Sequence, residues 1–232
     1  MALVFLAVAG NEKRAAAGLT RQNWKSAVLI VLAFVGIYIV RTVVSVAVQG
    51  VSDGSGMQYV KEWAAMFKNP MMWLNIAALP INYFFVFIAF FGEEYGWRYY
   101  LQPVLQKRFG LRAGVIILGV VWGLWHIPDD LFYYTQTSGI QMIFAQQITC
   151  ISLGIFFAYA YMKTQNIWVP VCLHYLNNNL IPIISGTLSA DVMENQNVSW
   201  RDLPVAVVLN GLCFGFFLLA DVFKKKEVQE EE

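Results

Sequence analysis

Long apolar runs alternate with short polar segments along this chain. A helix needs about 20 mostly apolar residues to cross the roughly 30 Å hydrocarbon core of a bilayer. Six runs approach or exceed that length, and we expect transmembrane helices at Ser26–Val48, Asn75–Tyr100, Ala113–Pro128, Ile140–Met162, Ile167–Ile184 and Leu203–Phe223. The connecting segments are short, without an internal repeat or a Gly/Ser linker. The pattern therefore predicts an all-α, polytopic membrane helical bundle that forms a single domain over residues 1–232.

Composition supports this class. Hydrophobic residues make up 58% of the chain and charged residues only 13%, whereas soluble domains are about one quarter charged. The net charge of +1 argues against a nucleic-acid partner, so we expect membrane lipids as the surrounding partner. Cys150, Cys172 and Cys213 lie inside apolar runs without CxxC spacing, which predicts buried free thiols.

Basic residues predict the orientation of the bundle. Six spans place both termini on the same side, and Lys224, Lys225 and Lys226 after the last span mark that side as cytoplasmic. With Arg98 included, 12 of the 16 basic residues fall there. Lys61, Lys68 and Arg201 fall outside, and Arg41 lies within a span. This asymmetry predicts that both termini are cytoplasmic.

Several ionisable side chains lie inside the predicted spans. Such groups cost about 2.5 kcal/mol or more each in a bilayer, and they mark functional sites by default. They are Glu93, Glu94, Arg98 and the chain's two histidines, His126 and His174. With the amide Asn178 nearby, these residues are the candidates for chemistry.

Their depths agree. At a rise of 1.5 Å per residue, Glu93, His126 and Asn178 lie about 21–22 Å from basic residues at the cytoplasmic ends of their helices, and His174 lies about 16 Å away. Three different predicted helices therefore bring polar side chains to a similar level.

Local spacing assigns first roles. Glu94 and Arg98 are four positions apart, share a helix face and favour a structural ion pair, which leaves Glu93 directed elsewhere. His174 and Asn178 share a face by the same spacing. The neighbouring amides Asn177 and Asn179 fit interhelical hydrogen bonds better than chemistry.

A partly polar wall follows Glu93 towards the cytoplasm. Tyr95, Tyr99, Gln102 and Gln106 form it, with Tyr99 the aromatic side chain that we expect to face a substrate. We therefore expect a water-accessible cavity that is reached from the cytoplasmic side.

Three chemistries fit these residues. A carboxylate and an imidazole at one depth can activate water, and a histidine with an amide one turn away can stabilise a developing oxyanion. Glu93, His126 and His174 could alternatively ligate zinc, although no HExxH motif is present. Buried carboxylates also serve as proton relays in transporters, but a single cluster without repeat symmetry argues against that class.

Three short motifs on successive predicted helices carry a family resemblance. Glu93–Arg98 matches an EExxxR motif, Trp122–His126 resembles an aromatic-xxx-His motif, and His174–Asn178 matches HxxxN. In this order they resemble the type II CAAX prenyl protease and bacteriocin-processing family of intramembrane glutamic endopeptidases. The resemblance covers roughly residues 85–184.

The resemblance implies roles for these residues. Glu93 and His126 would activate water, and His174 and Asn178 would form the oxyanion hole, without a metal or other cofactor. Glu94, Arg98 and the neighbouring Tyr99 would shape the site or contact substrate. The implied substrate is a prenylated or otherwise membrane-associated peptide cut near its C-terminus. A zinc-dependent membrane protease and a non-catalytic bacteriocin-immunity-type membrane protein stay open as alternatives.

Overall fold

The structure, a computed structural model, describes residues 17–53, 56–185 and 194–224, and every regular element in these ranges is helical. The all-α prediction is thus confirmed. Lys13, Arg14, Lys225 and Lys226, which contributed to the predicted orientation, lie outside the described residues. The elements are α3 (Trp24–Asp53), α4 (Gly56–Lys68), α5 (Pro70–Glu94), η1 (Tyr95–Leu101), α6 (Gln102–Phe109), α7 (Leu111–Trp125), α8 (Ile127–Phe132), α9 (Gly139–Thr164), α10 (Trp168–Ser185), α12 (Asp202–Cys213), η2 (Gly215–Leu219) and η3 (Asp221–Phe223).

Four of these helical segments are long and apolar enough to cross a membrane. They are Trp24–Ser45, Pro70–Phe109, Leu111–Phe132 and Gly139–Thr164, which correspond to the first four predicted spans. The described residues form a helical bundle with the composition of an integral membrane protein.

The fifth and sixth predicted spans are helical but fall outside this set. α10 carries His174 and three consecutive asparagines, which lower its hydropathy. α12 has only 12 residues, and the chain beyond it continues in the tighter 3₁₀ turns of η2 and η3. The two segments are therefore helical, as predicted, but they lack the apolar length of the other four predicted spans.

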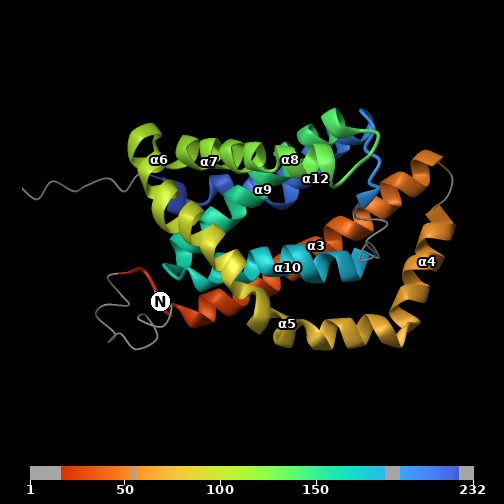
Figure 1. Ribbon diagram of the computed structural model, residues 1–232, viewed down its shortest axis with the longest axis horizontal. Coiled ribbons are helices and arrows are strands. Elements are labelled where there is room, and N and C mark those ends of the chain that lie inside the picture. The colour runs from red at the N-terminus through yellow and green to blue at the C-terminus, as the bar shows by residue number, and fades with distance from the viewer. Residues whose placement is uncertain (1–16, 54–55, 186–193, 225–232) are drawn as a thin grey trace, which may run out of the picture.

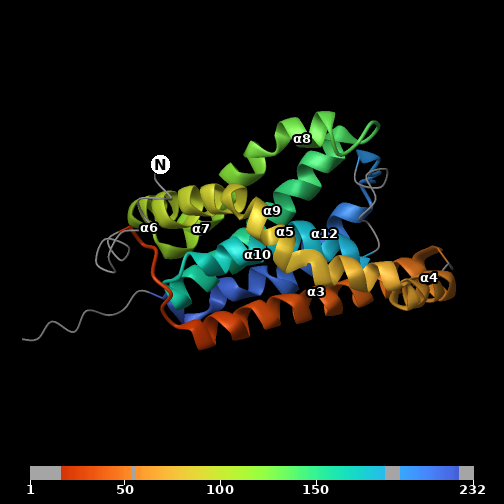
Figure 2. The same ribbon diagram turned by 60° about the horizontal axis from the view of Figure 1, so that its bottom comes forward.

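The bundle is elongated, and α9 lies at its centre, packed against α7, α10 and α12 (Figures 1 and 2). Small residues allow α7 to approach α9 closely. A Cβ atom on Gly119 would lie 2.6 Å from Cα of Ile151, and Gly154 packs against Gly119 from the α9 side. This use of glycine between backbones is typical of membrane helix interfaces.

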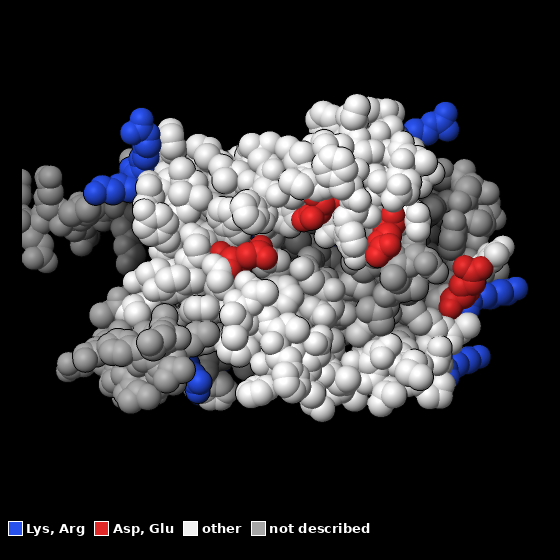
Figure 3. Space-filling view, in the orientation of Figure 1, with Lys and Arg blue, Asp and Glu red and all other residues white. Residues whose placement is uncertain are grey.

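The bundle has two ends that matter for the site. The α6 end contains α6, the close of α9 and the described chain ends at residues 17 and 224; the α8 end contains α4, α8 and the turn between α8 and α9 (Figure 1). Figure 3 shows Lys and Arg at the two ends of the long axis, and on this face the surface between them carries only acidic charges. A charge-poor middle with basic ends fits a membrane-spanning body.

A short N-terminal segment, residues 17–23, covers part of the α6 end. Thr20 Oγ1 donates to the carbonyl of Gln165, and Asn23 Nδ2 donates to the carbonyl of Thr164, at the C-terminus of α9. Asn166 Nδ2 donates in turn to the carbonyl of Gln22. These bonds satisfy carbonyl groups that a helix terminus leaves without partners.

Candidate active site

The segment that carries the two adjacent glutamates ends α5 and leads into a π-helix. Tyr95–Leu101 winds with the wider i→i+5 pattern, which occurs frequently at functional sites. Glu94 and Arg98 lie on the buried face of this segment, and both are fully buried. Glu93 is only half-buried and points to the neighbouring face.

Glu94 joins two other site residues. Its Oε2 lies 3.0 Å from Nε of Arg98, which confirms the predicted ion pair. Its Oε1 lies 2.9 Å from Nδ1 of His174 on α10, a contact that the sequence analysis missed. Because a carboxylate can only accept, Nδ1 of His174 carries the proton and Nε2 is left for the cavity.

Arg98 lies against two aromatic rings next to the site. Its guanidinium lies 5.1 Å from the ring centroid of Trp122 and 5.5 Å from that of Phe157. Both rings are buried, so the cation has aromatic faces around it in place of water. Arg98 does not itself line the cavity. It contacts Trp122, which does, and Glu94, which holds the lining residue His174.

His126 lies at a break between two helices. It closes α7 and precedes α8, where Pro128 prevents the backbone from continuing the same hydrogen-bond ladder. Its Nδ1 is 2.9 Å from the carbonyl oxygen of Trp122. A carbonyl only accepts, so Nδ1 carries a proton and Nε2 is the ring nitrogen left for the cavity.

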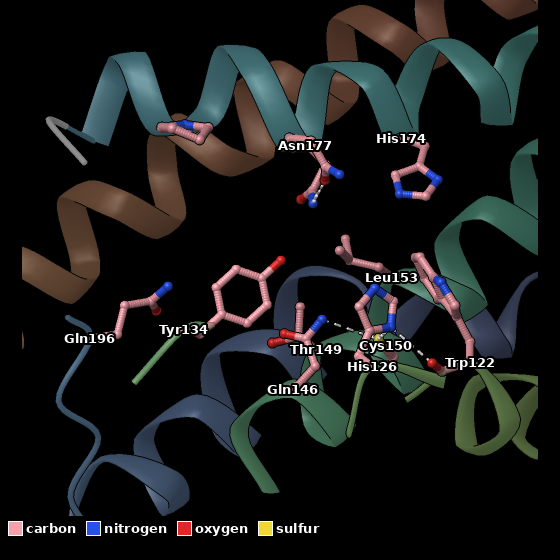
Figure 4. A pocket seen from close by; sticks show the side chains of 12 residues that line it. Trp122, His126, Tyr134, Gln146, Thr149, Cys150, Leu153, His174, Asn177 and Gln196 are labelled. Carbon is pink, nitrogen blue, oxygen red and sulfur yellow. Dashed lines mark hydrogen bonds between the residues drawn. The ribbon is translucent and has the colours of Figure 1, made fainter. Parts of the chain in front are cut away.

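The two histidines meet in one cavity of about 220 Å³ (Figure 4). The ring of Trp122 lies between them, with centroids 5.8 Å from His126 and 5.4 Å from His174. Three of the four predicted catalytic residues, His126, His174 and Asn178, line this polar cavity. The structure thus brings His126 together with His174 and Asn178, which are 48 and 52 positions further along the sequence.

The three asparagines of α10 have different surroundings. Tyr38 of α3 donates to Oδ1 of Asn177, and Asn82 of α5 donates to Oδ1 of Asn179 at 3.2 Å. These bonds agree with the predicted interhelical role of the two residues, although Asn177 also lines the polar cavity. Asn178 is exposed at the cavity, and its Oδ1 accepts from Nδ2 of Asn177.

Glu93 lies in a second, neighbouring cavity. This apolar slot of about 380 Å³ is lined by Gly92, Glu93, Gly96, Trp97, Tyr100, Leu101 and Trp125. Trp125 of the apolar slot directly precedes His126 of the polar cavity in the sequence, so each cavity has a lining residue at the end of α7. In the part of the chain that the structure describes, Glu93 forms no hydrogen bond or ion pair.

Other polar side chains of the cavity were not predicted. Tyr134, Gln146, Thr149 and Gln196 line it, and no motif or unusual charge marked them in the sequence. Burial and then the charges of Asp129 and Asp130 raise the pKa of Tyr134, so its hydroxyl stays protonated and can donate.

Cys150 belongs to the same cavity. Its Sγ lies 3.9 Å from Nδ1 of His126 and accepts from Nε2 of Gln146 at 3.7 Å. The three cysteines are free in the structure, as predicted, but only Cys150 is fully buried, whereas Cys172 and Cys213 are half-buried because their helix faces are partly exposed. Because Nδ1 of His126 already donates to a carbonyl, the imidazole is not placed to take a proton from this thiol.

Two further sequence expectations concern Tyr99 and a metal. Tyr99 lines neither cavity; its ring stacks on Tyr95 at 4.6 Å and packs against Gly18. Among the described residues, no group of three or more His, Cys, Asp or Glu side chains is placed to hold a metal ion. Glu93, His126 and His174 do not form such a group in this arrangement.

Comparisons with known proteins show which family this chain resembles. Residues 73–180 match the family model described as type II CAAX prenyl endopeptidase Rce1-like. The chain is 27% identical over 125 residues to a CAAX prenyl protease 2 from Methanococcus maripaludis, an alignment that covers 50% of this chain and 45% of that protein. No solved structure matches. The matched region contains both glutamates, both histidines and Asn178, so the residues of the candidate site lie within the part of the chain that is similar to CAAX proteases.

Proposed function

We propose that this protein is an intramembrane endopeptidase that hydrolyses a peptide bond near the C-terminus of a lipid-modified or membrane-bound peptide. The observation that supports this proposal is the polar cavity, where His126 and His174 both contact the ring of Trp122 and, among the described residues, neither Nε2 atom has a hydrogen-bond partner. Such a pair suits peptide hydrolysis by an activated water without a nucleophilic side chain.

In this proposal, His126 and Glu93 together activate the attacking water molecule. Nε2 of His126 accepts the proton of a water molecule, while Glu93 orients that water or receives the proton from the neighbouring slot. The proposal is supported by the lining of the two cavities, because Trp125, which lines the apolar slot with Glu93, directly precedes His126 in the sequence. The scissile bond is proposed to lie between Glu93 and His126.

His174 and Asn178 stabilise the oxyanion of the tetrahedral intermediate. Once protonated, Nε2 of His174 donates to that oxygen, and the Asn178 amide supplies a second donor. Glu94 holds the His174 ring through Nδ1, and Arg98 fixes Glu94. Glu94 and Arg98 are therefore positioning residues.

The apolar slot supports a membrane-attached substrate. Its lining is almost wholly hydrocarbon and aromatic, and neither Gly92 nor Gly96 has an atom near the place of a Cβ, so the slot is open along one helix face. A single hydrocarbon chain of the substrate fits this space, while the peptide enters the polar cavity. The prenylated peptides of the CAAX family provide such a chain.

The proposal is tested by comparing wild type with Glu93→Gln and His126→Ala in detergent micelles, against a pool of prenylated and unprenylated membrane-anchored peptides. Mass spectrometry should find cuts that wild type makes and both variants do not. Glu62→Gln, an exposed carboxylate change on α4, serves as the matched control and should cut normally. Equal cutting by wild type and Glu93→Gln would remove Glu93 from the mechanism.

Metal dependence is decided in the same preparation. Metal analysis of the purified protein and cleavage after chelation should show full activity without stoichiometric zinc. Loss of cleavage on chelation, restored by zinc, would instead favour the zinc-dependent alternative.

Both termini are proposed to be cytoplasmic, from the charge asymmetry. The expected cytoplasmic access to the site depends on the polar wall of Tyr95, Tyr99, Gln102 and Gln106.

A further inference from the structure

The polar cavity is closed at one end and open at the other. Trp122, Leu153 and His174 at its inner end are 2–3% exposed, whereas Asn178 is exposed and Gln196 half-buried. α7 and α10 run towards the α8 end and α9 runs away from it, as Figure 1 shows. The exposed residues therefore lie on the α8 side, and the mouth of the cavity faces the α8 end.

The mouth is built from segments distant in sequence. The backbone N–H of Gln196 donates to the carbonyl of Tyr134, and that of Val198 donates to Oγ of Ser138. These bonds join the segment before α12 to the turn between α8 and α9. Figure 4 shows Tyr134 and Gln196 at the far side of the cavity from Trp122.

Packing closes the α6 side, where the sequence predicted a polar path. The hydroxyl of Tyr95 donates to the carbonyl of Ala17, and Gly18 lies against Tyr99. Gln102 is 1% exposed, and Gln106 donates to the carbonyl of Leu111. The residues expected to line a water-filled path are thus used in contacts between helices and with the N-terminal segment.

Charge assigns a side to each end. The described basic residues of the α6 end are Arg21, Lys25, Lys107, Arg108, Arg112, Lys163 and Lys224. Those of the α8 end are Lys61, Lys68 and Arg201. Under the positive-inside rule the α6 end is cytoplasmic, so the mouth lies on the opposite side.

The mouth also has a defined chemistry. Tyr134, Gln146, Thr149, Asn178 and Gln196 are neutral hydrogen-bonding side chains. Among the described lining residues there is no Lys, Arg, Asp or Glu. Amide and hydroxyl groups match the N–H and C=O groups of an extended peptide backbone, whereas a terminal carboxylate would find no fixed cation here.

We infer that the mouth at the α8 end admits an uncharged, extended peptide segment presented at the extracytoplasmic face of the membrane. This inference rests on the proposed function. It replaces the expected cytoplasmic access with access from the other side, and it favours peptides that continue beyond the scissile bond over those that end in a nearby free carboxylate.

Sealed membrane vesicles test the side of access. Gln136→Cys, in the exposed turn between α8 and α9, and Lys107→Cys, exposed on α6, form a matched pair for labelling by a membrane-impermeant maleimide in a background without the three native cysteines. Wild-type vesicles prepared in the same way receive a lipid-anchored peptide that detergent-solubilised wild type cuts, with a strongly charged reporter that prevents crossing.

We expect cleavage only in vesicles where Gln136→Cys is labelled and Lys107→Cys is protected, and we expect those vesicles to be right-side-out. Cleavage confined to vesicles where Lys107→Cys is labelled overturns the inference and leaves the protease proposal intact. Absence of cutting in detergent counts against the proposed function itself. In detergent, C-terminal amidation of the peptide should preserve cleavage, and a strict need for the free carboxylate would contradict the neutral mouth.

Discussion

Glu94 and His174, 80 positions apart in the chain, are joined by a hydrogen bond of 2.9 Å inside the bundle. The same carboxylate holds Arg98 at 3.0 Å, so one buried acid connects the π-helical segment to α10. An unpaired charge at this position would be very costly, because all three side chains are almost completely removed from solvent. The relationship fixes both the orientation and the tautomer of His174.

The first prediction concerns this buried pair. Arg98→Met leaves the Glu94 carboxylate without its cation and should lower the free energy of unfolding by about 3–5 kcal/mol. The double variant Glu94→Gln with Arg98→Met should recover part of that loss, because no charge is then left buried alone. Thermal unfolding of the four proteins in lipid nanodiscs measures the coupling. Strictly additive losses would contradict an energetically coupled pair.

The second prediction separates two neighbouring asparagines. Asn178→Ala removes a proposed oxyanion donor and should lower kcat by about 10²–10³-fold. Asn179→Ala removes a bond to Asn82 and should reduce stability while leaving kcat within a few-fold of wild type. Steady-state cleavage and thermal unfolding of both variants provide the comparison. If kcat fell equally in both, Asn178 would have no special role.

The helical class, and three of the residues that line the polar cavity, were predictable from the sequence because polar residues are conspicuous within apolar runs. Apolar runs gave the helices, and His126, His174 and Asn178 stood out as polar groups at one depth. The i,i+4 spacing was enough to predict the Glu94–Arg98 pair, since its geometry is local. The family resemblance agrees with the match over residues 73–180.

Other features depend on contacts that spacing cannot give. The bond from His174 to Glu94 needs the packing of α10 on α5, and the π-helical turns of Tyr95–Leu101 have no sequence signature. Ideal α-helical spacing also does not predict that Glu93 lines the apolar slot and not the polar cavity. Tyr134 and Gln196 are ordinary loop residues until tertiary bonds bring them to the cavity.

The third prediction concerns Cys150, whose thiol contacts His126. Cys150→Ala should keep cleavage within about tenfold of wild type, because the 3.9 Å contact with Nδ1 of His126 does not supply a base for a nucleophilic cysteine. Cleavage kinetics and resistance to thiol-alkylating reagents check this outcome. Complete inactivation, with an unchanged melting temperature, would point to a cysteine mechanism.

The fourth prediction uses two glycines in predicted spans. Gly119→Ala should destabilise the protein by about 1–3 kcal/mol, because the new methyl group would meet the Ile151 backbone at 2.6 Å. Gly36→Ala on α3 has nothing within 4 Å of the new methyl group and should be neutral or stabilising. Thermal unfolding in nanodiscs compares them. Equal stability of the two variants would contradict the close approach of α7 and α9.

The polar composition of α10 has a consequence for how the protein is made. A helix with His174 and three asparagines enters a bilayer poorly by itself, since each polar group seeks a partner inside the hydrocarbon. Its partners, Tyr38 on α3, Asn82 on α5 and Glu94 at the end of α5, are all synthesised earlier. Integration of α10 during translation therefore depends on the preceding helices, and the polar residues of the candidate site also make its assembly sequential.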